Sequence, residues 1–504
     1  MPKTPPDPIE APLEGNGQRV HSRLRPLSEE QCHSVLVLDS CLRECARLSG
    51  RTYHAFLSEW LSSGLASASH LPEWLKDALP QLSISRRRFE KARKRAEERL
   101  VQGVFAMAPD SESLPSGPNG PCPRVLFWVG HPVDDMPWAA VFNSRKPRQI
   151  LPNTAWLKAL RHALEEATFS ASMGLAASVG TLTHELVCAH AARTGTPLLA
   201  VLPFSLEDTA RERFTKDFAP NLSLTCLGSA TACPKPERMV CRDRLLAWLA
   251  DLHLVLDIRS GGNLDRVLRE QNRKEVRPAL TFMDSNPPLE KERREEISDQ
   301  PQCSASIVSP RDIAWSDYLF HYTRSAPEPW PGESCLDYLL SLLDAHPLCG
   351  HTALDTLSRI GLEGRVRASV RLVRGKEKAS SWSSVPPLQM ASLRRWNPAL
   401  IRWTFEPFGI AVSRERLKKL GAKPVIYAPD HLYARIPVFE RYRFQRHEPP
   451  RCSWKHEREW RLPEDFTIGN STMDIFLFVP NRNDAKTLIR RTGGRLSVVI
   501  LEDS

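Results

Sequence analysis

The feature that most constrains this chain is an alternation, between residues 122 and 284, of short apolar runs with longer helical patterns. The continuous apolar runs, typical of strands buried on both faces, are Val125–Val129, Ala139–Phe142, Pro197–Leu202, Leu222–Leu224 and Leu254–Leu256. The helical patterns cover Thr154–Ala167, Thr181–Arg193, Arg242–Ala250 and Leu264–Gln271. Such alternation predicts parallel strands joined by right-handed crossovers, and therefore a doubly wound, Rossmann-like nucleotide-binding domain.

Length and composition predict a multidomain α/β protein around this middle domain. With 504 residues and 41% hydrophobic content the chain can bury more than one core, because single cores stop growing near roughly 250–300 residues. Residues 1–27, rich in Pro and Gly, are expected to be a disordered lead, and residues 28–107 to be a helical region. Residues 285–310 are expected to be a linker. In residues 311–504 strands outnumber helices, which indicates an α+β domain.

The same composition limits the partners. No apolar run approaches the roughly 20 residues that a membrane-spanning helix needs, and no signal-peptide pattern opens the chain. We therefore expect a cytoplasmic protein without a membrane partner. The 12 Cys residues are scattered without Cys-x-x-Cys pairs, so neither a disulfide framework nor a metal site is expected. The net charge of +10 favours anionic partners, and a homo-oligomer stays open.

Three loops of the middle domain carry small or cationic residues next to expected strand ends and helix starts. They contain Asn143, Ser144 and Arg145, then Gly174, Ser178, Gly180 and Thr181, and finally Ser260 and Gly261. In a doubly wound sheet ligands bind at turns that enter helices, and small residues let backbone N–H groups approach a phosphate. We expect a nucleotide-like small molecule at these loops, although glycine-rich turns are also plain connectors.

A basic run begins at Arg86, Arg87 and Arg88, on a stretch that is expected to be helical through Leu100. Such a run can bind the phosphates of a nucleic acid. The alternative is a solvated helix face.

Part of the middle domain resembles the DNA-processing protein A (Smf) family. The resemblance rests on Asn143–Arg145, Ser172–Ala176, Gly195–Pro203 and Leu254–Gly262. The broader superfamily includes LOG-type phosphoribohydrolases and nucleotide-sensing domains of antiphage proteins. The resemblance implies a Rossmann-like domain that binds a nucleotide-like ligand or single-stranded DNA.

Two departures from these families lie in the same domain. The phosphate-binding turn of the DNA-processing proteins carries an Asp that the segment Ser178–Thr181 lacks. The catalytic Glu of the phosphoribohydrolases has its counterpart here only in the displaced Glu185. Ligand binding needs the loops but not the acid, so we expect this domain to sense a ligand rather than to catalyse.

The last 190 or so residues resemble a group of bacterial domains found in some abortive-infection proteins. The resemblance rests on His321-Tyr322-Thr323, Gly409-Ile410-Ala411, Pro424–Tyr427 and the Glu-x-Glu-Trp-Arg segment Glu457–Arg461. These domains look distantly like ADP-ribosyltransferases, in which a split β-sheet grips NAD. The resemblance implies that His321 contacts the ribose or diphosphate of NAD. It further implies that Glu459 or Glu457 stabilises an oxocarbenium-like centre.

A structural interpretation of the same residues stays open. His321 could be a satisfied core histidine. Glu459 and Arg461 occupy alternating strand positions and could form a solvent-side ion pair, with Trp460 facing the core. A further cluster, Arg394, Arg395, Arg402 and Trp403, could hold an anion or serve as a tethering surface.

The parts together predict a bacterial antiviral-defence protein that joins a sensor to an effector. The middle domain would bind a nucleotide-like signal, and the C-terminal domain would act on NAD or transfer ADP-ribose. Two alternatives are a single-stranded DNA-binding protein of the DNA-processing type and a non-catalytic immunity or interaction protein.

Overall fold

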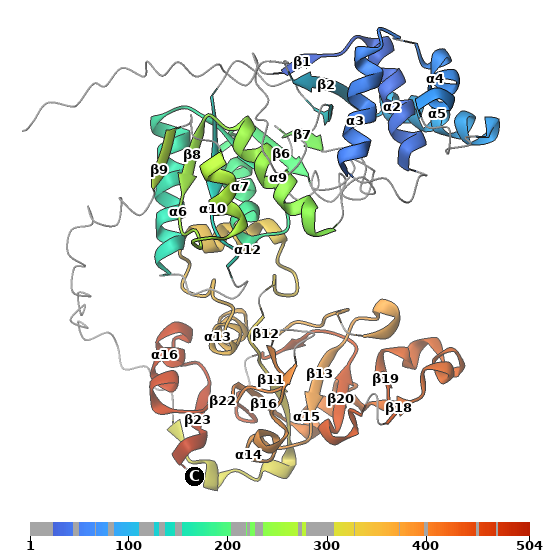
Figure 1. Ribbon diagram of the computed structural model, residues 1–504. Coiled ribbons are helices and arrows are strands. Elements are labelled where there is room, and N and C mark those ends of the chain that lie inside the picture. Colours follow the sequence, from blue (N-terminus) through green and yellow to red (C-terminus); the bar gives the residue numbers. More distant parts are fainter. Residues whose placement is uncertain are drawn as a thin grey trace, which may run out of the picture. The chain divides into compact units, whose positions relative to one another are not determined.

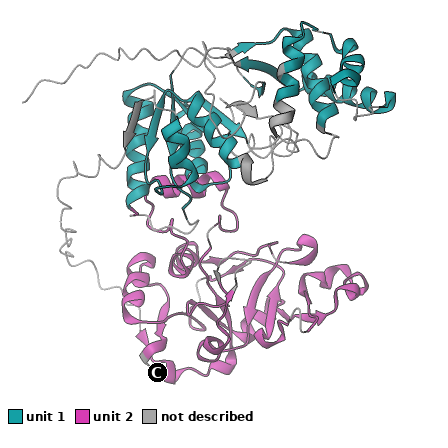
Figure 2. Ribbon diagram, viewed as in Figure 1, with its two compact units in different colours: residues 1–146, 155–286 teal, residues 147–154, 287–504 magenta. Residues whose placement is uncertain are grey.

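The computed structural model separates the chain into two units, each with its own sheet (Figure 1). Unit 1 comprises residues 1–146 and 155–286, and unit 2 comprises residues 147–154 and 287–504 (Figure 2). The mixed multidomain α/β class predicted from the sequence is confirmed. The structure describes residues 24–43, 50–65, 67–78, 85–109, 125–130, 137–146, 154–202, 218, 222–226, 235–270, 275–278, 307–326, 328–371, 373–397, 402–449, 453–469 and 472–503.

Unit 1 is built on a nine-stranded sheet with the order β1-β2-β3-β7-β6-β5-β4-β8-β9. The strands are β1 Leu24–Pro26, β2 Phe105–Pro109, β3 Leu126–Val129, β4 Trp138–Phe142, β5 Gly174–Ala177, β6 Leu198–Leu202, β7 Leu222–Cys226, β8 Leu252–Val255 and β9 Glu275–Pro278. The six strands from β7 to β9 are parallel. Every strand predicted for the middle domain is present.

Helices follow the strands of this parallel sheet as the alternation predicts. They are α6 Ala155–Glu165, continued by a π-helical turn Glu166–Ser170, then α7 Leu182–Thr194, α9 Lys235–Leu249 and α10 Asn263–Glu270. Trp138 and Phe142 of β4 pack in one cluster with residues of α9 and with Val267 of α10. Val141, which points to the opposite face, is also buried, and α7 packs against β4 and β5. Burial on both faces explains why these strands are apolar without interruption.

The helical N-terminal region is confirmed: it contains α2 Glu29–Arg43, α3 Gly50–Ser62, α4 Leu71–Ala78 and α5 Arg86–Val101. Two boundaries differ from the prediction. Leu24–Pro26, expected in the disordered lead, forms β1, and Phe105–Pro109, which reaches into an expected linker, forms β2. Ladder pairing with β3 extends the parallel sheet and satisfies the β2 backbone. Residues 1–23 and 110–124 lie outside the described residues.

Unit 2 contains an eight-stranded mixed sheet with the order β10-β23-β22-β16-β11-β13-β20-β17. These strands are β10 Ile307–Val308, β11 Tyr318–Tyr322, β13 Ser380–Ser383, β16 Gly409–Ser413, β17 Lys423–Pro424, β20 Glu459–Leu462, β22 Ile475–Val479 and β23 Ser497–Ile500. Three two-stranded sheets pair β12 Arg365–Val366 with β21 Phe466–Thr467, β14 Trp396–Asn397 with β15 Arg402–Trp403, and β18 Ile426–Ala428 with β19 Phe444–Arg446. The helices are α12 Cys335–Leu343, α13 Ala353–Glu363, α14 Pro387–Met390, α15 Arg414–Lys419 and α16 Arg482–Thr492.

Apolar cores lie on both faces of this sheet. One cluster joins Leu319, Trp382 and Leu462 to residues of α13, α15 and α16. The other gathers Phe320, Phe478 and further aromatic side chains on the opposite face. Because neighbouring strand residues point to opposite faces, each strand contributes to both cores. The α+β character predicted for this region follows from this arrangement.

Two predictions for the C-terminal region were wrong in detail. Ile307 and Val308, expected in the linker, pair with β23 as β10. The single strand expected over Pro424–Tyr427 is divided between β17, which pairs with β20, and β18, which pairs with β19. No helix in the described parts of the chain combines the length and apolar character that crossing a membrane requires.

A buried ion pair ties α5 to α2 and to the sheet. Arg99 Nη1 lies 2.6 Å from Asp39 Oδ2, and the Arg99 guanidinium carbon lies 4.9 Å from the ring centroid of Phe127 on β3. Arg99→Ala should lower the free energy of unfolding of unit 1 by about 3 kcal/mol, because it removes the cation from a buried carboxylate. Arg93→Ala removes an exposed pair with Glu90 on the same helix and should change it by less than about 0.5 kcal/mol. Chemical denaturation measures both, and equal effects would contradict the prediction.

Candidate functional site

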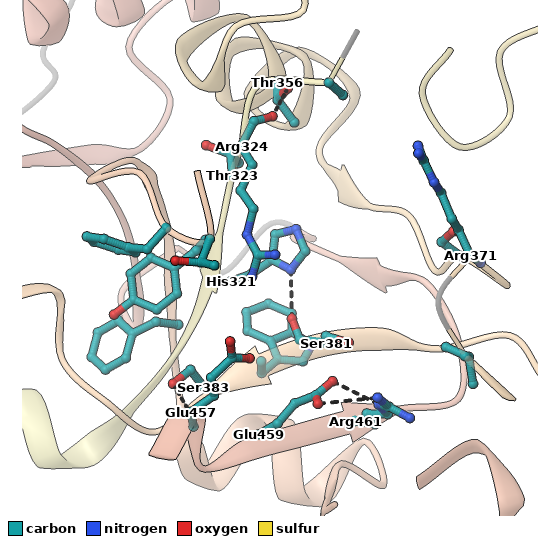
Figure 3. Close-up of a pocket in the computed structure, with 18 of the residues that line it drawn as sticks. His321, Thr323, Arg324, Thr356, Arg371, Ser381, Ser383, Glu457, Glu459 and Arg461 are labelled. Atoms are coloured by element: carbon teal, nitrogen blue, oxygen red, sulfur yellow. Dashed lines mark hydrogen bonds and ion pairs between the residues drawn. The ribbon is translucent and has the colours of Figure 1, made fainter. Parts of the chain in front are cut away.

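A cavity of about 580 Å³ opens in unit 2 beside β11, β13 and β20 (Figure 3). It is lined by apolar rings, among them Tyr322, Trp330, Trp382 and Phe405. The polar lining includes His321, Thr323, Arg324, Thr356, Ser369, Arg371, Ser381, Ser383, Gln445, Glu457, Glu459 and Arg461. The three acid and base candidates predicted from the sequence, His321, Glu457 and Glu459, therefore meet in one cavity.

The sheet is split where this cavity lies. Strand β11 pairs with β16 along its whole length, but Phe320–Ser383 is the one residue pair that joins β11 to β13. Beyond that pair, the His321 side chain bridges the gap: its Nδ1 lies 2.8 Å from the carbonyl oxygen of Ser381. A side chain thus replaces ladder hydrogen bonds at this point and leaves the adjacent backbone edges at the cavity.

The His321 hydrogen bond defines its tautomer. A carbonyl oxygen only accepts, so Nδ1 must carry the proton and donate it to Ser381. Burial lowers the pKa of His321 to about 4; the hydrogen bond to Ser381 opposes this shift and the nearby charge of Arg324 adds to it. At neutral pH the ring is uncharged, and its Nε2 is an acceptor for a ligand hydroxyl or a proton.

Glu459 is held by Arg461 in a two-point contact. Arg461 Nε and Nη2 lie 2.8 and 3.2 Å from the two carboxylate oxygens. The exposed fraction is 3% for the Arg461 side chain and 13% for that of Glu459. Trp460 packs against the core, as the structural interpretation expected, but the ion pair faces the cavity rather than solvent (Figure 3).

Glu457 does not lie on the strand with Glu459, as the sequence interpretation assumed. It closes a 3₁₀ turn, Lys455–Glu457, and Arg458 follows in the left-handed region with φ +43°. Its carbonyl oxygen accepts a 2.6 Å hydrogen bond from Ser383 Oγ. Burial raises the pKa of the Glu457 carboxyl; Arg324 opposes the shift and Glu459 adds to it. The two carboxyl groups therefore occupy different environments within one cavity.

Sequence reasoning missed several members of this site. Arg324 directly follows the His-Tyr-Thr motif and forms no ion pair with the described residues, although its charge acts on His321 and Glu457. Ser381 and Ser383 hold His321 and Glu457 through hydrogen bonds. Only the position of Arg324 within the motif carried a signal in the sequence. The serines lie in an unremarkable polar strand.

In unit 1 most of the predicted ligand loops gather at the carboxyl edge of the parallel sheet. The strand order reverses between β4 and β8, which is where ligands bind in doubly wound sheets. Ser144 joins these two strand ends: its N–H donates to the Asp257 carbonyl, and its Oγ accepts from the Arg259 N–H. Arg145 and Ser260 are exposed beside them.

Two of the predicted loop residues were misplaced. Gly174 begins strand β5 and pairs with Trp138, so it lies at the amino edge, opposite the other loops. Ser178 is fully buried, and its Oγ donates to the Val201 carbonyl. In addition, the Gly261 N–H already donates to Asp265 Oδ2. The short apolar run Gly174–Ala177 was read as a loop because its small residues hid a buried strand.

The start of α7 keeps the features of a binding site. Thr181 caps the helix by accepting from the His184 N–H, and Gly180 precedes it with φ +86°. Asn143 donates to Thr183 Oγ1. Among the described residues, Asn143 Oδ1 and His184 Nδ1 are buried and have no hydrogen-bond partner. Burial, with Arg242 adding, lowers the pKa of His184 to about 3, so its ring is neutral.

Arg86, Arg87 and Arg88 form the exposed first turn of α5, capped by Ser85. Cations at a helix N-terminus oppose the helix dipole, so the folded helix gains nothing from them there. No group of three or more His, Cys, Asp or Glu side chains in the described parts of the chain is arranged to hold a metal ion.

The pKa of His321 predicts a pH-dependent stability. Between its ordinary value of 6.5 and the folded value of about 4, the unfolded chain takes up a proton that the folded protein does not. Stability should therefore fall as the pH drops through this window and be unaffected by His321 above it. His321→Asn keeps a donor for Ser381 and should lose less stability than the wild type between pH 7 and pH 5. Thermal denaturation measures the difference, in which the other histidines cancel; equal losses would contradict the assignment.

Comparisons with known proteins add two weak likenesses. No protein-family model matches the chain, and no curated protein matches it. The structure of DNA processing protein A from Streptococcus pneumoniae is similar over 50% of this chain and 86% of that one, with 13% identity and a TM-score of 0.33. The single-stranded DNA-binding DNA processing protein A from Helicobacter pylori is similar over 36% and 86%, with 14% identity and a TM-score of 0.27. The Rossmann-like assignment of unit 1 rests on its own sheet topology.

Proposed function

We propose that the unit 2 cavity binds NAD and cleaves its nicotinamide–ribose bond, either hydrolysing NAD or transferring ADP-ribose. One observation carries the proposal. Two carboxyl groups in different environments share a cavity, beside a neutral histidine and an arginine without an ion pair, where the sheet is split.

The cavity suits a ligand with rings, sugars and a diphosphate. Its volume falls within the roughly 300–1,000 Å³ that small-molecule sites occupy. Aromatic rings offer faces and edges for flat heterocycles. The Arg324 guanidinium would pair with the diphosphate, and the unprotonated Nε2 of His321 would accept a hydrogen bond from a ribose hydroxyl.

The carboxyl groups would divide the chemistry. The glycosidic C–N bond breaks, and nicotinamide leaves with the bonding electron pair. Glu459, held in place by Arg461, would stabilise the positive charge that develops on the ribose. Glu457, whose raised pKa makes it a better proton acceptor, would take the proton of the attacking water or acceptor group as its oxygen or nitrogen bonds to the ribose.

The carboxyl groups can be tested one at a time. Glu459→Gln and Glu457→Gln keep size but remove charge, so each should lower NAD turnover by on the order of a hundredfold or more. Glu464→Gln changes an exposed acid close by in sequence and is the matched control. Nicotinamide release measured by chromatography checks the prediction. No turnover by the wild type, with no ADP-ribose on protein or nucleic acid, would leave unit 2 as a binding domain.

For unit 1 we propose a nucleotide-like ligand at the start of α7, where Asn143 and His184 present buried polar atoms without partners. Together the units would form the sensor and the effector of an antiviral-defence protein. Single-stranded DNA bound along Arg86, Arg87 and Arg88 is the second candidate for unit 1. A non-catalytic immunity role remains the alternative for the whole chain.

Gly180 allows a charge test of the unit 1 site. A Cβ at Gly180 would meet no atom within 4 Å, and its φ strains any side chain alike. Gly180→Asp should abolish binding, because its carboxylate would meet the ligand phosphate, whereas Gly180→Asn adds the same shape without charge and should retain much of it. Mass spectrometry of small molecules that co-purify with each variant reads this out. The same molecules at the same levels with Gly180→Asp would contradict the site.

A further inference from the structure

A hairpin at the mouth of the unit 2 cavity exposes two tryptophans. Trp396 on β14 and Trp403 on β15 are 50% and 37% exposed. They pair in register, with ring centroids 5.5 Å apart and planes 76° apart. Because the rings are not stacked on each other, the pair leaves aromatic faces open to a partner.

Cations accompany these rings. The Arg394 guanidinium carbon lies 4.3 Å from the Trp403 ring centroid. Arg394 and Arg395 are both exposed, and neither forms an ion pair with a described carboxylate. The hairpin therefore presents aromatic rings and positive charge together, without acidic groups paired to it.

The hairpin is fixed to the cavity at its base. The Arg395 N–H donates to Thr404 Oγ1 at 2.9 Å, and the Thr404 N–H donates to the Arg395 carbonyl at 2.8 Å. Trp403, Thr404 and Phe405 themselves line the cavity. Phe405 packs edge-on against Tyr322, the neighbour of His321. A partner bound to the hairpin would therefore lie at the entrance of the proposed reaction site.

We propose that this hairpin, defined by Arg394, Arg395, Trp396 and Trp403, docks a single-stranded nucleic acid. Bases stack on exposed aromatic rings regardless of sequence, while arginines pair with the phosphates. This combination, in a chain of net charge +10, fits a polyanion with flat rings better than it fits a protein surface.

Resting on the proposed function, the docked strand is also the acceptor of ADP-ribose. A ring nitrogen or hydroxyl oxygen of the strand forms the new bond to the ribose carbon as the bond to nicotinamide breaks. The nicotinamide leaves with its electron pair, and the acceptor proton passes to Glu457. The products are the ADP-ribosylated strand, nicotinamide and one proton.

Oligonucleotide binding, measured without NAD, tests the docking surface independently of the chemistry. With a fluorescent single-stranded 12-nucleotide DNA or RNA and the full chain at low salt, Trp396→Ala should weaken binding about tenfold, the effect of losing one stacked base. Phe439→Ala, at an exposed aromatic residue elsewhere in unit 2, should not. Arg394→Glu should also reduce the salt dependence by about one phosphate contact, whereas Arg490→Glu should not.

The outcomes separate the two layers of the proposal. Wild-type affinity in both Trp396→Ala and Arg394→Glu would overturn the docking surface. Loss of a protein partner by Trp396→Ala, with oligonucleotide affinity unchanged, would assign the hairpin to a protein instead. Weakened oligonucleotide binding, together with labelled ADP-ribose appearing on the strand, would support both layers. Weakened binding with NAD turnover but an unlabelled strand would keep the surface and reject the acceptor role.

Discussion

The candidate site of unit 2 depends on one buried cation, Arg461. Its guanidinium donates to the carbonyl oxygens of Tyr442 and Phe444, to Gln445 Oε1 and to both carboxylate oxygens of Glu459. A buried guanidinium is stable only when its donors are satisfied, so the segment around β19 and the strand β20 must come together around it. The same contacts fix the Glu459 carboxylate at the cavity wall.

The split between β11 and β13 is the second constraint. A continuous ladder would have satisfied the backbone and closed the sheet. Instead, His321 spans the gap to Ser381, and its neutral ring faces the cavity. Functional groups and sheet geometry are thereby coupled, because the residue that closes the split also supplies an acceptor atom. Glu457 adds to this arrangement from a turn, where backbone pairing does not dictate its direction.

In unit 1 the parallel sheet determines where chemistry can occur. Reversal of strand order at β4 and β8 brings Ser144 beside Asp257 and Arg259, while the start of α7 adds Asn143 and His184. Many polar groups predicted to bind a ligand are consumed by the fold itself, as Ser178 and Gly261 illustrate. Buried polar atoms without partners, rather than glycine content, distinguish the start of α7 from a plain connector.

Patterns local in sequence determined much of this protein. The alternation of apolar runs and helical periods predicted the strands and helices of the middle domain, and the His-Tyr-Thr and Glu-x-Glu-Trp-Arg segments named His321, Glu457 and Glu459, because burial and periodicity act between near neighbours. Other features depended on distant contacts. Strand β5 was hidden by small residues, β2 and β10 were recruited by strands far along the chain, and Glu457 was turned off its strand. Tertiary structure alone decided that the Glu459–Arg461 pair faces a cavity, because the backbone carbonyls that satisfy Arg461 come from a segment whose position no local pattern encodes.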